Sequence, residues 1–178
     1  MGRNNLNNLN LLPWTMKKLL LLAALTIGLS ASAQDYKGHY GIGLAVGEPS
    51  GFSIKKFNNS SEAFQYTVGY STGQNSGINL GVDFLLHNYD YISAERGSIP
   101  LYYGLGIHVK SYENENQIYA RAPLGIAYEL HDLPLDIFFE FSPGLAVVPT
   151  PSLVMNFGIG GRFYFDVKRA VEKLDEAI

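Results

Sequence analysis

The chain has 178 residues, enough for one domain, and only 16% of them are charged, against roughly 25% in ordinary soluble domains. It contains 19 glycines, 12 tyrosines and 10 phenylalanines but no cysteine, which excludes disulfides, thiolate metal sites and a lipoprotein anchor. Only 10 of the 13 basic residues but all 16 acidic ones follow Ala33, which leaves that part with a net charge of −6 and no basic cluster for nucleic acid.

The first 33 residues contain the pattern of an export signal. Met16-Lys17-Lys18 is followed by an apolar run, Leu19–Leu29, and then by the Ala31-x-Ala33 cleavage pattern. The apolar run is shorter than the roughly 20 residues of a membrane-spanning helix. The sequence therefore predicts a signal peptide over residues 16–33, cleaved after Ala33. Residues 1–15 are Asn-rich, and we expect them to be a non-native or mis-annotated extension.

From Tyr40 onward, apolar residues alternate with small or polar ones, a period that is typical of half-buried strands. The expected strands cover residues 40–46, 52–55, 64–70, 78–86, 101–110, 121–129, 136–145 and 155–165. Mostly short connections separate these runs, including a polar loop at 113–116, which favours antiparallel pairing. Residues 34–165 are therefore predicted to form an all-β fold, an eight-stranded antiparallel up-and-down barrel. Helical spacing of apolar residues predicts a short amphipathic helical tail over 166–178.

The face of these strands that carries small side chains indicates which face lines the lumen and which meets the surroundings. It carries ten glycines: Gly41, Gly43, Gly69, Gly81, Gly104, Gly106, Gly125, Gly144, Gly158 and Gly160. The interior of an eight-stranded barrel is just wide enough for side chains, so the small face belongs inside and the bulky face meets lipid. Aromatic residues near expected strand ends fit an interfacial girdle: Tyr40, Tyr70, Tyr119, Tyr128, Phe163 and Phe165. The sequence thus favours a transmembrane β-barrel.

Parity places eight charged side chains in the lumen: Lys55, Asp83, Lys110, Arg121, Glu129, Asp136, Glu140 and Arg162. Buried charges are tolerated when they are paired, so we expect a network of ion pairs. Glu140 and Arg162 are predicted to pair diagonally across one hairpin. Such a network is consistent with a structural plug or with a narrow pore whose pairs exchange partners.

The histidines give no sign of catalysis. His39, His87 and His131 fall at strand ends or turns, and His108 faces the lumen. His108 and Ser111 lie three apart on opposite faces of one strand, which prevents proton transfer between them. No catalytic residue, metal ligand or cofactor is predicted. A lipid-modifying barrel enzyme and a soluble, lipocalin-like periplasmic carrier are the alternative interpretations.

Four segments resemble the small porin-like, OmpA-type outer-membrane barrels of Gram-negative bacteria: Gly43–Gly51, Leu101–Gly106, Arg121–Tyr128 and Gly158–Phe165. The resemblance implies the fold, a bacterial outer-membrane location and, weakly, a pore. We further expect contact with outer-membrane lipids, a monomer and, from the acidic charge, no nucleic-acid partner. Gly160, Phe163 and Phe165 resemble the C-terminal pattern by which the barrel-assembly machinery recognises such proteins. That pattern usually ends the chain, whereas residues 166–178 follow it here.

Overall fold

The computed structural model describes residues 39–72, 76–113 and 115–166. The predictions for residues 1–33 and for a helix beyond Asp166 lie outside this part of the chain. In the described part, no helix is long and apolar enough to span a bilayer.

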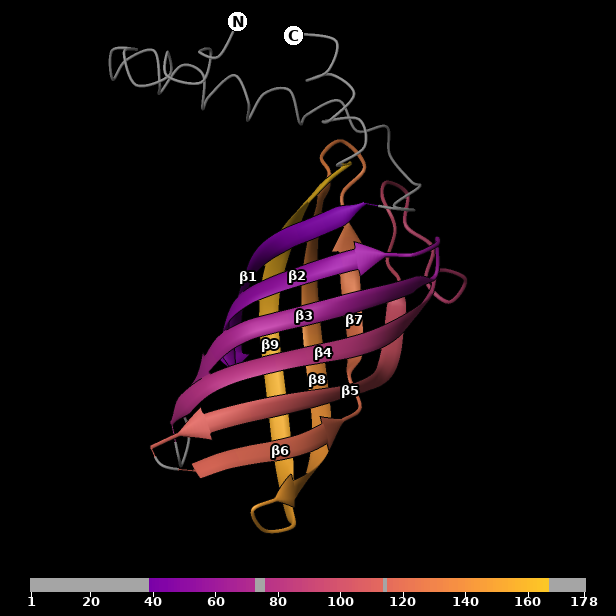
Figure 1. Cartoon of the computed structure of the whole chain (residues 1–178). Coiled ribbons are helices and arrows are strands. Elements are labelled where there is room, and N and C mark those ends of the chain that lie inside the picture. The colour runs from indigo at the N-terminus through magenta and orange to yellow at the C-terminus, as the bar shows by residue number, and fades with distance from the viewer. Residues whose placement is uncertain (1–38, 73–75, 114, 167–178) are drawn as a thin grey trace, which may run out of the picture. The chain divides into compact units, whose positions relative to one another are not determined.

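The described residues form a single antiparallel sheet that closes on itself (Figure 1). Its strands are β1 (Tyr40–Glu48), β2 (Ser50–Phe57), β3 (Glu62–Ser71), β4 (Gly77–Asn88), β5 (Leu101–Tyr112), β6 (Glu115–Arg121), β7 (Leu124–Glu129), β8 (Leu135–Val148) and β9 (Ser152–Phe165). The strands β1 to β5 pair in sequence order, as do β8 and β9, while β6 and β7 together fill the place between β5 and β8. Strand β9 returns to pair with β1 along nine residue pairs, from Tyr40↔Phe165 to Glu48↔Phe157. Over these pairs the sheet has no open edge, as a barrel requires, and the all-β antiparallel prediction is confirmed.

The strand between β5 and β8 differs from the prediction. It was expected to begin near Arg121 after a loop at 113–116, but β6 already begins at Glu115. Ala122-Pro123 then separates β6 from β7, and both segments pair with β5 on one side and β8 on the other. The structure thus has nine strand segments where eight strands were expected. The interruption has a chemical cause, since proline has no N–H with which to continue a strand ladder.

The two faces of the barrel wall differ as the alternation predicts. Bulky apolar side chains point outward, and Leu44, Leu105 and Phe157 are 58%, 72% and 57% exposed. The inward side chains are almost fully buried, although many are polar. Hydrophobic side chains on the outside and polar ones inside reverse the pattern of a soluble barrel and match that of a membrane barrel.

Glycines on the inner face make room for large side chains from neighbouring strands. A Cβ added to Gly81 would overlap the His108 ring, and one added to Gly125 would overlap the Tyr102 ring. Gly81 lies directly opposite His108 on β5, and Gly125 lies opposite Tyr102. The lumen is therefore filled by side chains that lie flat across the neighbouring strand, and it needs a glycine beneath them.

Candidate functional site

The barrel lumen is the candidate site, because polar side chains concentrate there. All eight charged residues that parity placed inside are buried in the structure, and none is more than 9% exposed. They are Lys55, Asp83, Lys110, Arg121, Glu129, Asp136, Glu140 and Arg162.

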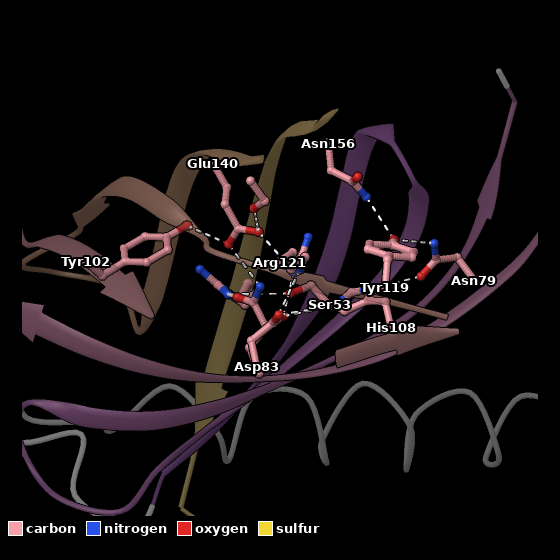
Figure 2. Close-up of polar contacts among 12 residues, drawn as sticks. Ser53, Asn79, Asp83, Tyr102, His108, Tyr119, Arg121, Glu140 and Asn156 are labelled. Carbon is pink, nitrogen blue, oxygen red and sulfur yellow. Dashed lines mark hydrogen bonds and ion pairs between the residues drawn. The ribbon is translucent and has the colours of Figure 1, made fainter. Parts of the chain in front are cut away.

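Arg121 on β6 is the centre of the network (Figure 2). Its Nε donates to Oδ1 of Asp83 at 2.8 Å, and Nη2 donates to Oδ2 of the same carboxylate. Nη2 also lies 3.1 Å from Oε1 of Glu140 on β8. Glu140 accepts further hydrogen bonds from Gln65 Nε2 at 2.9 Å and from the Tyr102 hydroxyl at 3.1 Å. One guanidinium thus holds two carboxylates, one from β4 and one from β8, which lie on either side of β6 in the sheet.

Arg162 on β9 forms the second ion pair, with Asp136 rather than with Glu140. Its Nη2 lies 3.0 Å from Asp136 Oδ2, and its guanidinium lies 3.8 Å from the centre of the Phe138 ring. The predicted Glu140–Arg162 pair is wrong because of register: β8 and β9 pair Asp136 with Arg162, and Glu140 with Gly158.

Gln65 on β3 connects the two ion pairs. Its amide nitrogen donates to Glu140, while its amide oxygen accepts from Arg162 Nη1 at 2.6 Å. At the other end of this cluster, the Tyr164 hydroxyl donates to Asp136 at 2.8 Å. The polar contacts therefore run without a break from Tyr164 to Asp83.

Beyond Asp83 the network continues through uncharged groups (Figure 2). His108 Nε2 lies 3.2 Å from Asp83 Oδ1, and its Nδ1 lies 2.9 Å from Asn79 Oδ1. The amides of Asn79 and Asn156 both donate to the Tyr119 hydroxyl, at 2.7 and 3.0 Å. Ser53 of β2 also accepts from Arg162 Nη1, at 3.4 Å, so side chains from seven strands, β2 to β6 together with β8 and β9, meet across the lumen.

The remaining charges are less closely matched. Lys55 Nζ lies 3.1 Å from His87 Nε2 and 4.5 Å above the Tyr102 ring, and Glu129 accepts from the Tyr89 hydroxyl at 3.1 Å. Lys110 lies 4.0 Å from Glu48. Among the residues that the structure describes, neither Lys55 nor Glu129 forms an ion pair, which the prediction of a fully paired set did not anticipate.

Several predicted positions have a different environment from the one expected. Tyr119 was assigned to an interfacial girdle, but it is only 1% exposed and lies in the lumen. His87 lies near the end of β4, as expected, and its side chain faces inward, where it is buried. The network's uncharged members, such as Gln65 and Asn79, share the parity of the charged ones. Their place on the inward-facing side of the alternation was therefore the sequence signal that could have identified them.

The three residues of the predicted assembly signal all lie on β9. Gly160 faces inward beneath the Phe138 ring. Phe163 and Phe165 are half-buried, and the Phe165 ring stacks on Tyr40 of β1 with centroids 6.4 Å apart. These aromatic residues therefore lie on the β9–β1 pair that closes the barrel.

Among the described residues, the lumen holds neither a Ser–His pair nor a cluster of metal ligands. His108 is held between Asp83 and Asn79, while Ser111 is exposed on the other face of the strand. In the described part of the chain, no three histidine, aspartate or glutamate side chains are grouped to hold a metal ion. Most of the polar groups in the lumen instead contact one another.

Comparison with known proteins identifies the family. The sequence profile described as "Outer membrane protein beta-barrel domain" matches residues 19–168. A search of curated proteins finds no match. The chain is similar to the N-terminal β-barrel domain of Pseudomonas aeruginosa OprF, with 15% identity, a TM-score of 0.49, and coverage of 73% of this chain and 100% of that one. Because the family profile spans most of its length, the chain belongs to the outer-membrane protein β-barrel domain family.

Proposed function

We propose that this protein is a non-enzymatic, monomeric outer-membrane barrel with a structural role, whose lumen is closed by the charge network. The observation that carries the proposal is the unbroken set of contacts from Tyr164 through Arg162, Gln65 and Arg121 to the Tyr119 hydroxyl. Such a network is rigid, because separating one of its ion pairs leaves a charged group without a partner in a medium of low dielectric.

The recess beside this network is small. A recess lined by Ser53, Gln65, Arg121, Glu140 and Ser142 has a volume of about 30 Å³. That volume holds about one or two water molecules, which is too little for a continuous column of hydrated ions. The sequence also supports export by the signal peptide over residues 16–33, cleavage after Ala33, and delivery by the barrel-assembly machinery.

Planar-bilayer recording of the purified, refolded full chain tests the closed lumen. We expect no conductance steps from the unmodified protein. We expect steps from Arg121→Ala, because this change removes the group that joins Asp83 to Glu140. Thr67→Ala is the matched control, since it also shortens a side chain lining the recess but breaks none of these contacts. Regular steps from the unmodified protein would overturn the proposal.

A narrow pore is the second candidate, and one observation favours it. Arg121 contacts two carboxylates at once, so it keeps one anionic partner when its contact with the other breaks. If the barrel is a narrow pore, we expect the unmodified protein to conduct and Glu140→Gln to change the duration of each open event.

The non-enzymatic part of the proposal is supported by His108, whose two ring nitrogens contact Asn79 and Asp83 rather than a serine hydroxyl among the described residues. Mass analysis of lipid A from cells with and without the protein tests it. We expect identical spectra, and a mass shift that depends on the protein would show a lipid-modifying activity.

A further inference from the structure

The first residues of β9 lack a neighbouring strand on one side. Strand β9 begins at Ser152, but β1 ends at Glu48, which pairs with Phe157. Residues 152–156 therefore pair with β8 alone. Figure 1 shows the β8–β9 hairpin projecting past the end of β1. We call the unpaired side of residues 152–156 the β9 edge.

Pro143, which lies opposite Met155, shows which backbone groups point toward the β9 edge. The Pro143 carbonyl accepts from the Ala122 N–H at 2.8 Å, so it points away from β9. In an antiparallel pair the backbone groups of opposed residues point either toward each other or away from each other, so those of Met155 point away from β8. The direction repeats every two residues, which adds the N–H and C=O of Leu153, and the Phe157 carbonyl faces β1 accordingly. Among the described residues, the backbone groups of Leu153 and Met155 have no partner on this side.

The β9 edge extends beyond the part of the barrel that a bilayer covers. A membrane-spanning strand has about 9–11 residues, which matches the 9 residues of β1, whereas β9 has 14. Residues 152–156 lengthen the strand by roughly 17 Å, at about 3.4 Å per residue. Unpaired backbone groups are strongly unfavourable in hydrocarbon. The β9 edge is therefore placed in water or among lipid headgroups.

The side chains of the β9 edge are uncharged, and the outward ones are apolar. Leu153 is 77% exposed, the highest value of any large hydrophobic side chain in the described part of the chain, and Met155 is 55% exposed. No charged residue occurs from Phe141 to Phe157. Proteins usually protect an open strand edge with charged side chains or a covering segment. The β9 edge has no such charge, and no described residue pairs with it, so it is suited to receive another strand.

We infer that the β9 edge binds an extended, uncharged peptide segment of another protein, which adds to the sheet as a strand antiparallel to β9. The added strand continues the line of β1 and extends a pairing that β1 already makes over nine residue pairs. Its backbone exchanges hydrogen bonds with Leu153 and Met155, and apolar residues at alternate positions pack against their side chains. The β9 edge lies outside the lumen, so peptide binding and a closed lumen can fail independently.

Other occupants fit the β9 edge less well. Two copies of the chain in one membrane have the same orientation, and their strands tilt by about 35–45°. Their β9 edges therefore cross at a wide angle instead of running antiparallel. A lipid has no alternating row of N–H and C=O groups to match those of the strand.

Hydrogen exchange with a tethered peptide tests this inference. The chain has no cysteine, so Thr150→Cys in the β8–β9 turn gives a single attachment point on the full chain refolded in lipid vesicles. The probe is a blocked Thr-Val-Thr-Val-Thr peptide with a short Gly-Ser linker and a cysteine at its C-terminal end. The linker is placed there because a strand antiparallel to β9 ends beside Ser152. A short flexible tether gives an effective peptide concentration in the millimolar range.

We expect the Leu153 and Met155 amides to exchange roughly tenfold more slowly with the peptide attached, because each gains about one hydrogen bond. The Val154 amide points toward β8, so its exchange should not change. The matched control peptide carries N-methyl groups on its two valines, which removes the donors that face β9, and it should slow neither amide. Met155→Pro removes one N–H from the β9 edge and none that faces β8, so it should abolish the slowing at Leu153 while the gel shift of the folded barrel remains.

Two results would overturn the inference. The first is equal exchange at Leu153 and Met155 with the probe, with the N-methylated peptide and with no peptide, or equal slowing by both peptides. The second is occupation by a second copy, which the single change Leu153→Cys detects in membranes. Leu105→Cys is its matched control, because Leu105 is 72% exposed on the outer face of β5. We expect both variants to form disulfide-linked dimers at the same low level, and a clear excess from Leu153→Cys would assign the β9 edge to a second copy.

Discussion

Replacing Arg162 by methionine should destabilise the barrel strongly. Arg162 is fully buried and Asp136 is only 1% exposed, so Arg162→Met leaves a carboxylate in the lumen without its cation. Removing one partner of a buried ion pair costs about 3–5 kcal/mol. Asp136→Asn keeps a hydrogen-bond acceptor in place and should cost less, about 1.5–3 kcal/mol, the value of a hydrogen bond to a charged group.

A double-mutant cycle identifies the partner of Arg162. Combining Arg162→Met with Asp136→Asn should reveal a coupling of about 1–3 kcal/mol, because the two side chains touch. Combining Arg162→Met with Glu140→Gln should give a coupling energy of less than about 1 kcal/mol, because Glu140 is connected to Arg162 only through Gln65. Urea unfolding in lipid vesicles, followed by the gel shift of folded barrels, measures each free energy of unfolding. An equal or larger coupling to Glu140 would refute the register argument.

Three further changes test other parts of the structure. Gly81→Ala should cost about 1–3 kcal/mol in the same unfolding assay because its Cβ overlaps the His108 ring, and His108→Ala should relieve part of that loss. Val82→Arg, at the middle of β4 on the outer face, should cost about 2–4 kcal/mol, whereas Ile78→Arg near the strand end should cost clearly less; equal costs would contradict a lipid-facing wall. A chain truncated after Phe165 should still insert into the outer membrane, as measured by fractionation, and failed insertion would count against the assembly-signal interpretation.

The alternation of residue types was sufficient to predict the wall and its inner face. A period of two fixes which side of a strand each residue occupies, so Lys55, Asp83 and Arg162 could be placed in the lumen from the sequence alone. Alternation says nothing about how far one strand slides along the next. The register between β8 and β9 decided that Arg162 meets Asp136, and it had to be read from the structure.

The misplaced elements have a similar explanation. Residues 115–120 are mostly polar near the beginning of β6, so their alternation was too weak to distinguish from a loop. Tyr119 was assigned by its residue type, which is common in girdles, although its parity matches that of Arg121. Only the contacts of its hydroxyl with Asn79 and Asn156 show why a tyrosine lies inside.

The glycines beneath the lumen rings also constrain how the protein can evolve. Enlarging Gly81 requires a smaller residue at His108, and enlarging Gly125 requires a smaller one at Tyr102. The barrel must preserve the combined side-chain volume of each pair rather than the identity of either residue. Among relatives, these positions should therefore change together, and a lineage that exchanged one ring for a small side chain would gain space inside the wall without altering any strand.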